Sequence, residues 1–403
     1  MATRLAYLVS EYPGISHTFI FREICSLRHQ GVTVLTASIR KPAYLHVMTG
    51  AEKEEANETL YIKDSSAWEI IRAHLSLILK HPVCYWALLW AGLALVYRGP
   101  KSIIKAVGYL AEAGVLVAWM LSNKTFHIHV HFASPAATVA MLASAFADIS
   151  FSVSVHGPDA LYNVDTYLLP EKIKKSQFIR CISHYSKSQL QRLVPYKYWE
   201  KIRIVRCGVD PEVYRPVEHI TGDKPEILCV GRLVPSKGQH VLVNAVKVLK
   251  QRAIAFHLTM VGDGEDMQSL QVLTNELVLQ DSILFTGALG QHQVRDYYDK
   301  ADIFVLPSFA EGVPVVLMEA MAKEIPVVST LITGIPELIT NDKDGILVSP
   351  ADHLQLADAL ERLLLDAEMR KEMGRKGRQK VVAKYNLENN NKKMVELFQQ
   401  YVL

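Results

Sequence analysis

Two glutamates, Glu311 and Glu319, lie eight residues apart around a loop that enters a helix. The loop follows the apolar run 303–306, a predicted strand, and Pro314 suits the first turn of the helix. Such a helix start offers unpaired backbone N–H groups and a partial positive charge, which favour phosphate or sugar oxygens. The N–H groups concerned belong to Gly312, Val313, Val315 and Val316. In isolation the two glutamates would be solvated surface residues, but in this context they can address different parts of one elongated ligand.

A second loop, residues 230–238, carries Arg232 and Lys237 and also leaves the end of a predicted strand. Ligands of open α/β sheets bind at such strand ends. Two fixed cations would stabilise the negative charge that grows on a departing diphosphate, without a metal. An exposed loop is the alternative, and the neighbouring glutamate loop favours the functional interpretation.

Histidines mark the ends of two predicted strands in the first half of the chain. His156 follows the run 151–155 and can hydrogen-bond a sugar hydroxyl; burial at a strand end is the alternative. His127, His129 and His131 alternate along one strand and so share a face, which would permit metal binding if a further ligand stood nearby.

The elements that would position these residues alternate between short apolar runs and helical patterns. In the first half, strand-like runs occur at 5–9, 32–39, 128–132, 151–155, 178–182 and 202–205. In the second half, they occur at 227–230, 258–261, 283–285, 303–306 and 327–329. This alternation predicts two parallel, doubly wound sheets, and the stretch 208–225, rich in proline and glycine, predicts the linker.

Bulk composition excludes several classes of protein. The 403 residues carry 44 basic and 41 acidic side chains, too even a balance for a nucleic-acid footprint. Five scattered cysteines without CxxC spacing argue against a disulfide framework or a zinc site and favour a reducing cytoplasm. The N-terminal run 5–9 is read as a strand and not as a signal peptide.

The segment 68–121 is unusually apolar, and 83–97 is nearly uninterrupted apolar and aromatic sequence flanked by Lys80 and Arg98. Fifteen helical residues are shorter than the roughly 20 that a bilayer-spanning helix needs. Two interpretations stay open: helices that lie in a membrane interface, and helices buried in an enlarged core.

Taken together, the two loops resemble those of retaining glycosyltransferase family 4, whose second domain carries a Gly-Arg…Lys-Gly loop and two glutamates eight positions apart. The resemblance continues through 260–264, 285–287, 305–308, 326–328 and 334–338 in the family's order and covers roughly residues 200–390. It implies that Arg232 and Lys237 hold a diphosphate, Glu319 the ribose hydroxyls and Glu311 a hydroxyl of the transferred sugar. It also implies donor contacts by Gly262 and by Leu289, which would line the base.

The first half matches the family more loosely. The resemblance places His156 near the reacting carbon of the donor sugar and His131 and Asp159 on the acceptor side, with His127 and His129 as packing residues. Gly14 is the one glycine available where many members have a Gly-Gly turn beside the phosphates. The form is similar to the branch that builds colanic acid and related exopolysaccharides, with His17 in place of an acidic residue.

The resemblance implies the glycosyltransferase B architecture: two Rossmann-like α/β domains, a deep interdomain cleft, and a C-terminal helix that returns to the first domain. The expected parts are 1–207, the linker 208–225, 226–385 and 386–403. The implied activity is transfer of a hexose from a UDP- or GDP-sugar to a glycan or polyprenyl-linked glycan, in the cytoplasm or on the inner face of its membrane.

Rival functions are a nucleotide-sugar epimerase and a non-catalytic nucleotide-binding scaffold. A dehydrogenase is disfavoured because Met267 stands where the third glycine of a GxGxxG turn belongs. The DxD pattern Asp342-Lys343-Asp344 is read as a surface turn, and no essential metal or cofactor is expected.

Overall fold

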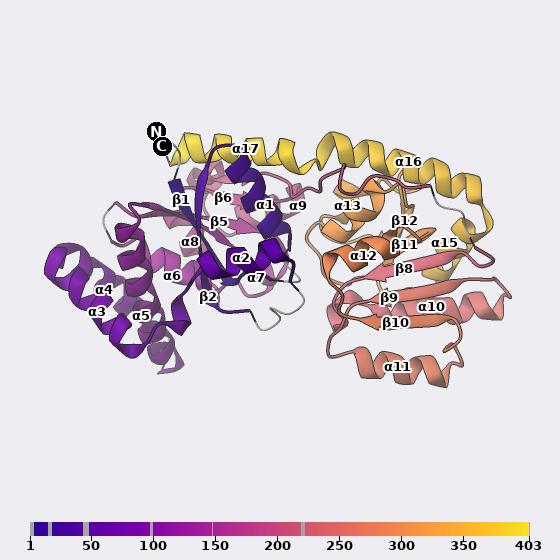
Figure 1. Cartoon of the computed structure of the whole chain (residues 1–403), viewed down its shortest axis with the longest axis horizontal. Helices are drawn as coiled ribbons and strands as arrows, with labels where there is room; N and C mark the ends of the chain where they lie inside the picture. Colours follow the sequence, from indigo (N-terminus) through magenta and orange to yellow (C-terminus); the bar gives the residue numbers. More distant parts are fainter. Residues whose placement is uncertain are drawn as a thin grey trace. The chain divides into compact units, whose positions relative to one another are not determined.

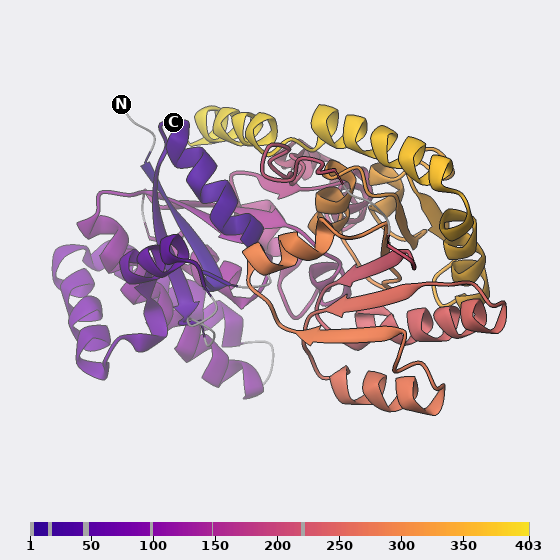
Figure 2. The same cartoon turned by 45° about the vertical axis from the view of Figure 1, so that its right-hand side comes forward.

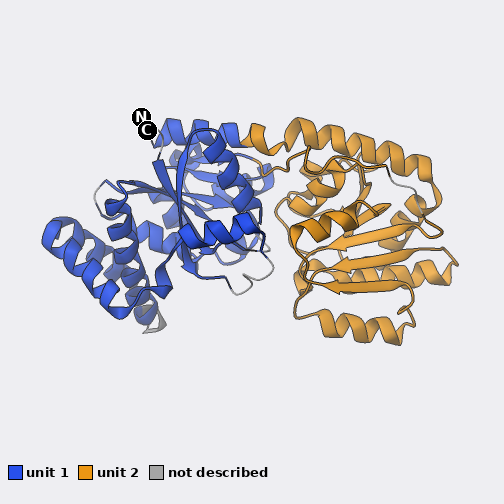
Figure 3. Ribbon diagram, viewed as in Figure 1, with its two compact units in different colours: residues 1–205, 391–403 blue, residues 206–390 orange. Residues whose placement is uncertain are grey.

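A computed structural model describes residues 4–14, 18–42, 48–96, 100–146, 148–218 and 222–402. The chain divides into two compact units, residues 1–205 with 391–403 and residues 206–390 (Figure 3). Each unit is built on its own parallel sheet, as the alternation of apolar runs and helices predicts. His17 and Arg98, noted above in the sequence, lie outside the described residues.

The first unit contains a seven-stranded sheet in the order β3-β2-β1-β4-β5-β6-β7, in which every pairing is parallel. Its strands are β1 Arg4–Glu11, β2 Thr33–Arg40, β3 Leu60–Tyr61, β4 His127–His131, β5 Ser150–Val155, β6 Ile179–Cys181 and β7 Ile202–Ile204. The inner strands are buried along nearly their whole length, because helices cover both faces of a parallel sheet. The order reverses between β1 and β4, which makes this the switch point of the sheet.

Nine described helices belong to the first unit before residue 206 (Figure 1). They are α1 Thr18–His29, α2 Gly50–Glu58, α3 Ala67–Lys80, α4 Pro82–Val96, α5 Pro100–Ser122, α6 Pro135–Ala143, α7 Asp159–Tyr162, α8 Leu169–Lys175 and α9 His184–Gln191. Helices α2 and α3 each begin with a capping box, at Thr49 with Glu52 and at Ser66 with Glu69.

The last helix, α17 Leu387–Tyr401, returns to the first unit as expected from the fold class. Its Met394, Leu397 and Phe398 are buried in one core cluster with Leu5 and Tyr7 of β1. These apolar residues, three and four apart, form the stripe that an amphipathic helix buries.

Helices α3, α4 and α5 pack on one another beside the first sheet, and α5 also packs on α6 (Figures 1 and 2). Residues 103–122 of α5 are long and apolar enough to cross a membrane by length and composition alone, and 39% of the most apolar part of this stretch is buried within the protein. Core helices of soluble proteins have the same length and composition.

The second unit contains a six-stranded parallel sheet in the order β10-β9-β8-β11-β12-β13. Its strands are β8 Glu226–Val230, β9 His257–Val261, β10 Ile283–Gly287, β11 Ile303–Leu306, β12 Val327–Thr330 and β13 Ile346–Val348. Its helices are α10 Gln239–Gln251, α11 Met267–Glu276, α12 Gln291–Tyr298, α13 Val315–Ala322, α14 Ile335–Leu338, α15 His353–Leu365 and α16 Ala367–Lys384. The order reverses between β8 and β11, so the loops after these two strands flank the switch point.

Candidate active site

The loop after β8 is held against the end of β11 by a glycine. A short 3₁₀ turn, Pro235–Lys237, is followed by Gly238 in the left-handed region, with φ of +66°. A Cβ on Gly238 would lie 2.3 Å from the carbonyl oxygen of Pro307, the residue after β11. The backbone N–H of Phe309 also donates to the carbonyl of Ser236 at 2.8 Å. The two loops that flank the switch point are therefore in direct contact.

Lys237 and Glu311 meet where these loops touch. The Nζ of Lys237 donates to Oε1 of Glu311 at 2.5 Å, and the hydroxyl of Ser308 donates to the same oxygen at 2.8 Å. The hydroxyl of Thr333 donates to the backbone carbonyl of Glu311 at 2.5 Å. Glu311 is buried, so its carboxylate is oriented by fixed partners and not by solvent.

Arg232 lies in the same loop but differs in its surroundings. Its side chain is exposed, and within the described part of the chain its guanidinium makes no hydrogen bond or ion pair. Its backbone carbonyl accepts from the Gln239 amide at 2.9 Å, which ties the loop to the start of α10. An anchored backbone with a solvated guanidinium suits recognition of an anion such as a diphosphate.

Helix α13 begins directly after the glutamate loop. Pro314 is its N-cap and Val315 its first residue, so Pro314 stands one position earlier than expected from the sequence. Gly312, Val315 and Val316 are partly exposed, whereas Val313 is buried. The first turn of a helix leaves backbone N–H groups without intrahelical partners, which suits an anionic ligand.

Glu319 lies in the second turn of α13 and is held by two tyrosines. Tyr214 donates to its Oε1 at 2.8 Å and Tyr298 to its Oε2 at 3.1 Å. Tyr298 also reaches the carbonyl of Val316 at 3.2 Å. The sequence analysis missed both tyrosines, because they come from the segment before β8 and from α12, far from either motif.

Glycines allow the ends of β8, β9 and β10 to approach one another. Gly262 has φ of +144°, and a Cβ there would lie 1.9 Å from the carbonyl oxygen of Gly231; a Cβ on Gly264 would lie 2.2 Å from that of Leu233. This close approach explains both glycines, which occupy the first two glycine positions of the GxGxxG pattern that Met267 interrupts. Leu289 lies half-buried in the loop after β10.

In the first unit, the structure brings His131 and His156 together. Nδ1 of His131 and Nε2 of His156 are 2.8 Å apart, and both side chains are buried. Asp159 is exposed at the start of α7, and Gly14 is partly exposed in the loop after β1. Burial is the largest of the effects that lower the pKa of His156 well below its usual value, so its imidazole is neutral near pH 7.

His127 and His129 are buried packing residues, as expected from the sequence, and they also make hydrogen bonds. Each imidazole is hydrogen-bonded through both nitrogens to serine hydroxyls of β5, at 2.7–2.8 Å. Glu23 stands where the sequence analysis required a further metal ligand near this strand. One ligand atom each of Glu23, His129 and His131 lies within 4.8 Å of the other two. Arg180 is already bonded to Glu23, however, and this permanent cation opposes a second one.

The Asp342-Lys343-Asp344 segment is only partly the surface turn expected from its sequence. Asp342 is exposed and lies 2.9 Å from Arg362. Asp344 is buried, accepts from the backbone N–H of Thr340 at 2.6 Å and pairs with Lys380 at 3.2 Å. Asp344 thus serves the local structure, because internal partners already satisfy its carboxylate.

The two sheets, their order and the loops at the β8/β11 switch point define a two-unit, doubly wound α/β fold. Residues 210–380 match the family described as glycosyl transferases group 1. The matched range lies within the second unit.

Two curated relatives carry glycosyltransferase names. The chain is 38% identical over 208 residues to WcaL of Escherichia coli (strain K12), which is named as a colanic acid biosynthesis glycosyltransferase. That match covers 50% of this chain and about half, 51%, of the relative. The WcaL protein of Salmonella typhimurium (strain LT2) is 27% identical over 98% of this chain and 99% of its own length.

Solved structures share the fold over the whole chain. Sucrose-phosphate synthase from Thermosynechococcus elongatus superimposes with a TM-score of 0.77 at 19% identity, covering 99% of this chain and 98% of its own. HepE from Anabaena, in complex with UDP, gives a TM-score of 0.74 at 15% identity, covering 99% and 100%. At these identities the likeness establishes the fold alone.

Proposed function

We propose that this chain is a retaining hexosyltransferase. It moves a sugar from a UDP- or GDP-sugar to a hydroxyl of a glycan or polyprenyl-linked glycan in surface or exopolysaccharide biosynthesis. The observation that carries the proposal is the Lys237–Glu311 pair, fixed where the loops after β8 and β11 touch and directly before α13. The names of the colanic acid relatives support the pathway, and the UDP complex of HepE supports the donor class.

The proposed roles follow from charge and position. Arg232 and Lys237 hold the diphosphate and stabilise the negative charge that grows on it as the glycosidic bond breaks. Backbone N–H groups at the start of α13 share this task. Glu319 accepts hydrogen bonds from the ribose hydroxyls, and Glu311 accepts one from the transferred sugar. His156 hydrogen-bonds another hydroxyl of that sugar, and no metal is essential in this scheme.

Retention is proposed because the two loops resemble those of retaining glycosyltransferases. Since the scheme above assigns no carboxylate nucleophile, retention then requires that the acceptor hydroxyl attacks from the face that the diphosphate leaves. The anomeric configuration of the product, read from proton NMR coupling constants, tests this step. A product of inverted configuration contradicts retention and leaves the donor site untouched.

The reaction class is tested with purified protein, radiolabelled UDP- and GDP-sugars and a membrane extract as the source of acceptor. Labelled lipid-linked glycan supports transfer. Isomerised free donor without labelled glycan identifies an epimerase, and nucleotide binding without turnover identifies a scaffold. A thermal-shift screen of donors, done first, selects the base and sugar.

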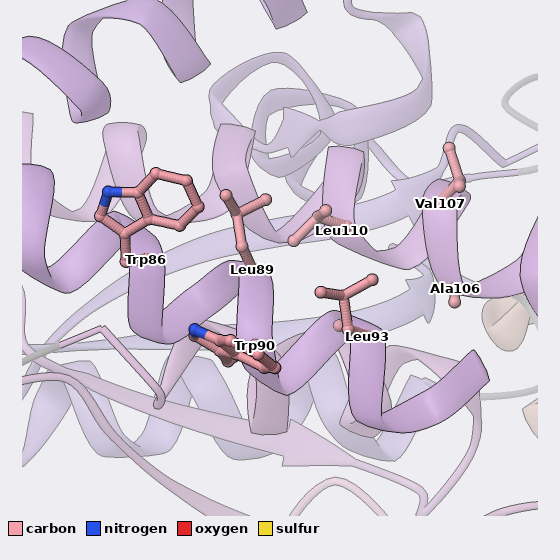
Figure 4. A pocket seen from close by; sticks show the side chains of 8 residues that line it. Trp86, Leu89, Trp90, Leu93, Ala106, Val107 and Leu110 are labelled. Atoms are coloured by element: carbon pink, nitrogen blue, oxygen red, sulfur yellow. The ribbon is translucent and has the colours of Figure 1, made fainter. Parts of the chain in front are cut away.

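The partners proposed for this enzyme include an anionic membrane surface, contacted by α3–α5. These helices expose large apolar side chains, among them Leu79, Val83, Trp86 and Trp90, each more than 60% exposed. The pocket between α4 and α5 has a volume of about 190 Å³ and an entirely apolar lining that includes the two tryptophans (Figure 4). Soluble surfaces rarely expose so large an apolar patch without a partner.

Charge favours an anionic bilayer as that partner. Residues 67–122 contain five basic and two acidic side chains, while α4 contains no charged residue at all. Apolar and aromatic side chains with basic neighbours are the pattern of helices that lie in the interface of a membrane. We therefore propose that the enzyme works in the cytoplasm, peripheral on the inner face of the cytoplasmic membrane, where a polyprenyl-linked acceptor would reside.

Cosedimentation with vesicles tests this contact. The full chain should pellet with vesicles of phosphatidylglycerol and phosphatidylcholine, less with phosphatidylcholine alone, and less at high salt. The double variant Trp86→Ser/Trp90→Ser should stay in the supernatant. The control Val272→Ser/Val278→Ser changes exposed apolar residues of the second unit and should pellet like the unmodified chain.

Equal recovery of all three proteins in the supernatant contradicts the membrane contact. A second copy of the chain is the competing occupant of the apolar surface. Light scattering that shows a dimer, lost in the Trp86→Ser/Trp90→Ser variant and without vesicle binding, would assign the surface to self-association.

A further inference from the structure

Strands β4 and β5 form a ladder of imidazoles and hydroxyls within the first unit. Their register places His127, His129 and His131 opposite Ser150, Ser152 and Ser154. Each of the first two imidazoles bridges two successive serines through its two ring nitrogens. Side chains of period two on paired strands share one face, so the ladder follows directly from the alternating sequence of both strands.

His131, the last residue of β4, departs from this repeat. Its Nδ1 lies 2.8 Å from Nε2 of His156, which follows the C-terminal end of β5. The two rings are nearly coplanar, with an angle of 5° between them. Its Nε2 lies 3.3 Å from Oε1 of Glu23 of α1, close enough for a strong electrostatic interaction although the angle does not meet hydrogen-bond geometry. The buried chain Glu23–His131–His156 thus joins a helix of the first unit to the candidate histidine.

Glu23 is kept ionised in this buried place. Burial alone would raise its pKa, but the Arg180 guanidinium, 2.5 Å from Oε2, and His131 hold the pKa well below its usual range. The hydroxyl of Tyr7 donates to Oε1 at 2.9 Å. Burial is also the largest of the effects on the pKa of His131, which it lowers. Near pH 7 the anionic carboxylate of Glu23 therefore faces a neutral His131 imidazole.

A carboxylate beside a neutral imidazole selects one of its two tautomers. The N–H of His131 is stabilised on Nε2, facing Glu23, because the opposite tautomer would set a nitrogen lone pair against a carboxylate oxygen. Nδ1 of His131 is then an acceptor. The only matching donor on His156 is an Nε2–H, so Nδ1 of the neutral His156 ring carries no proton.

We propose that Glu23 is a positioning residue that acts through His131. It fixes the proton of His156 on Nε2, so that Nδ1 can meet a hydroxyl of the bound sugar only as a hydrogen-bond acceptor. The tautomer assignment concerns the protein alone, whereas its consequence for catalysis rests on the proposed glycosyltransferase function.

Imidazole ¹⁵N NMR tests the tautomer without any substrate. In the ¹⁵N-histidine-labelled full chain, long-range ¹H–¹⁵N spectra distinguish protonated from unprotonated ring nitrogens, and the signals absent from a His156→Gln variant belong to His156. We expect a single Nε2–H tautomer at pH 7.5. In Glu23→Gln the amide can accept or donate, so His156 should show a mixture of both tautomers.

Glu23→Gln leaves Arg180 without its buried counter-charge, so this variant could fail to fold. Two variants of His131 then provide the test in its place. In His131→Asn the amide oxygen stands near the place of Nδ1 and still accepts, so His156 should keep its Nε2–H tautomer. In His131→Phe no acceptor remains, and the single tautomer should be lost. Ser150→Ala, at the far end of the ladder, serves as the control and should leave the His156 signals unchanged.

Kinetics then measure the catalytic consequence. Glu23→Gln and His131→Phe should lower kcat by about 10- to 100-fold, as losses of orienting partners do, with the KM for the donor little changed. His131→Asn should recover much of the loss, which a purely structural role for His131 would not predict.

A proton on Nδ1 of His156 in the unmodified chain overturns the proposal. So does a His156 tautomer that stays the same in both Glu23→Gln and His131→Phe. If all the tautomers are as expected but the unmodified chain transfers no sugar, the relay stands and the proposed function fails.

Discussion

The ammonium of Lys237 and the carboxylate of Glu311 are 2.5 Å apart, although 73 residues separate them between positions 237 and 311. The same Glu311 oxygen accepts from Ser308, three residues earlier in the chain. Both charged groups are therefore fixed before any ligand binds. A site that is oriented in advance stabilises developing charge without reorganising during the reaction.

Replacement of either loop cation should lower turnover. We expect Lys237→Ala and Arg232→Ala each to reduce kcat for transfer by about 100-fold or more, the size of effect seen when a preorganised charge is removed. Initial rates with saturating donor measure this. Lys237→Ala should lower the free energy of unfolding more than Arg232→Ala does. The Lys237 substitution leaves Glu311 without its cation, whereas Arg232 is exposed and unpaired among the described residues.

Arg252→Ala is the matched control for these losses. Arg252 is a cation of the same unit, and its ion pairs with Asp358 and Glu361 lie on the surface outside the two loops. Its turnover should equal that of the unmodified chain. Near-normal turnover in both loop variants would remove the diphosphate assignment.

The hydrogen bonds of Glu319 should govern donor affinity more than turnover. Glu319→Ala should weaken binding of the nucleotide sugar by about 10-fold or more, because a carboxylate that accepts two hydroxyls loses charge-assisted bonds. Tyr298→Phe, which removes one hydrogen bond to the carboxylate, should have a smaller effect in the same direction. Isothermal titration calorimetry with the donor measures both, and unchanged affinity in Glu319→Ala would contradict the ribose assignment.

Much of the fold and part of the site follow from the sequence. The apolar runs locate most strands, since a strand buried on both faces must be apolar throughout, and Leu387–Tyr401 carries a recognisable amphipathic stripe. β3 and β13 were missed because two or three residues are too few to form a pattern. The Lys237–Glu311 contact lay within reach, because both loops follow strands that are neighbours at a switch point.

The sequence does not predict contacts between side chains that lie far apart along the chain. Tyr214 and Tyr298 meet Glu319 only through the packing of the folded unit. The histidine alternation of β4 is visible in the sequence, but its serine partners require the β4–β5 register, and Glu23 comes from a helix on a different part of the chain. Asp344 looked solvated because its turn residues are polar, whereas Lys380 of α16 covers it.

Gly238 should be the residue of the β8 loop least tolerant of a side chain. Gly238→Ala requires both a left-handed backbone and a Cβ 2.3 Å from the Pro307 carbonyl. We expect a loss of about 1–3 kcal/mol in the free energy of unfolding, the range for strained backbone positions. Urea denaturation measures it.

Gly231→Ala in the same loop is the control, because a Cβ there meets nothing within 4 Å and its φ is not in the left-handed region. Its free energy of unfolding should change by less than about 1 kcal/mol. Equal stability of the two variants would contradict the close contact between the loops after β8 and β11.

The buried histidines of β4 should make the protein sensitive to mild acid. Burial lowers the pKa of His127 from 6.5 to about 3 and also lowers those of His129, His131 and His156. Because the unfolded chain takes up protons near pH 6.5 and the folded chain does not, stability is present above that pH and is lost as the pH falls through it. His127, with its pKa of about 3, should remove about 1.4 kcal/mol from the free energy of unfolding between pH 7.5 and 5.5, and the other three histidines should act in the same direction.

Lys172 and Glu23 do not reverse the sign of this change. Burial lowers the pKa of folded Lys172 to about 7, whereas the unfolded side chain keeps its proton throughout, so a fall from pH 7.5 towards 7 also removes stability. The pKa of Glu23 is held well below its usual range, so the folded carboxylate titrates below the interval. Urea denaturation at pH 7.5, 6.5 and 5.5 should therefore show a steady fall. His127→Gln should be less stable at pH 7.5, yet its loss down to pH 5.5 should be smaller by about 1.4 kcal/mol, because one proton fewer is taken up on unfolding. A free energy of unfolding that stays constant from pH 7.5 to 5.5 would mean that these imidazoles are protonated equally in both states, which is incompatible with a buried ladder of neutral rings bonded to serine hydroxyls.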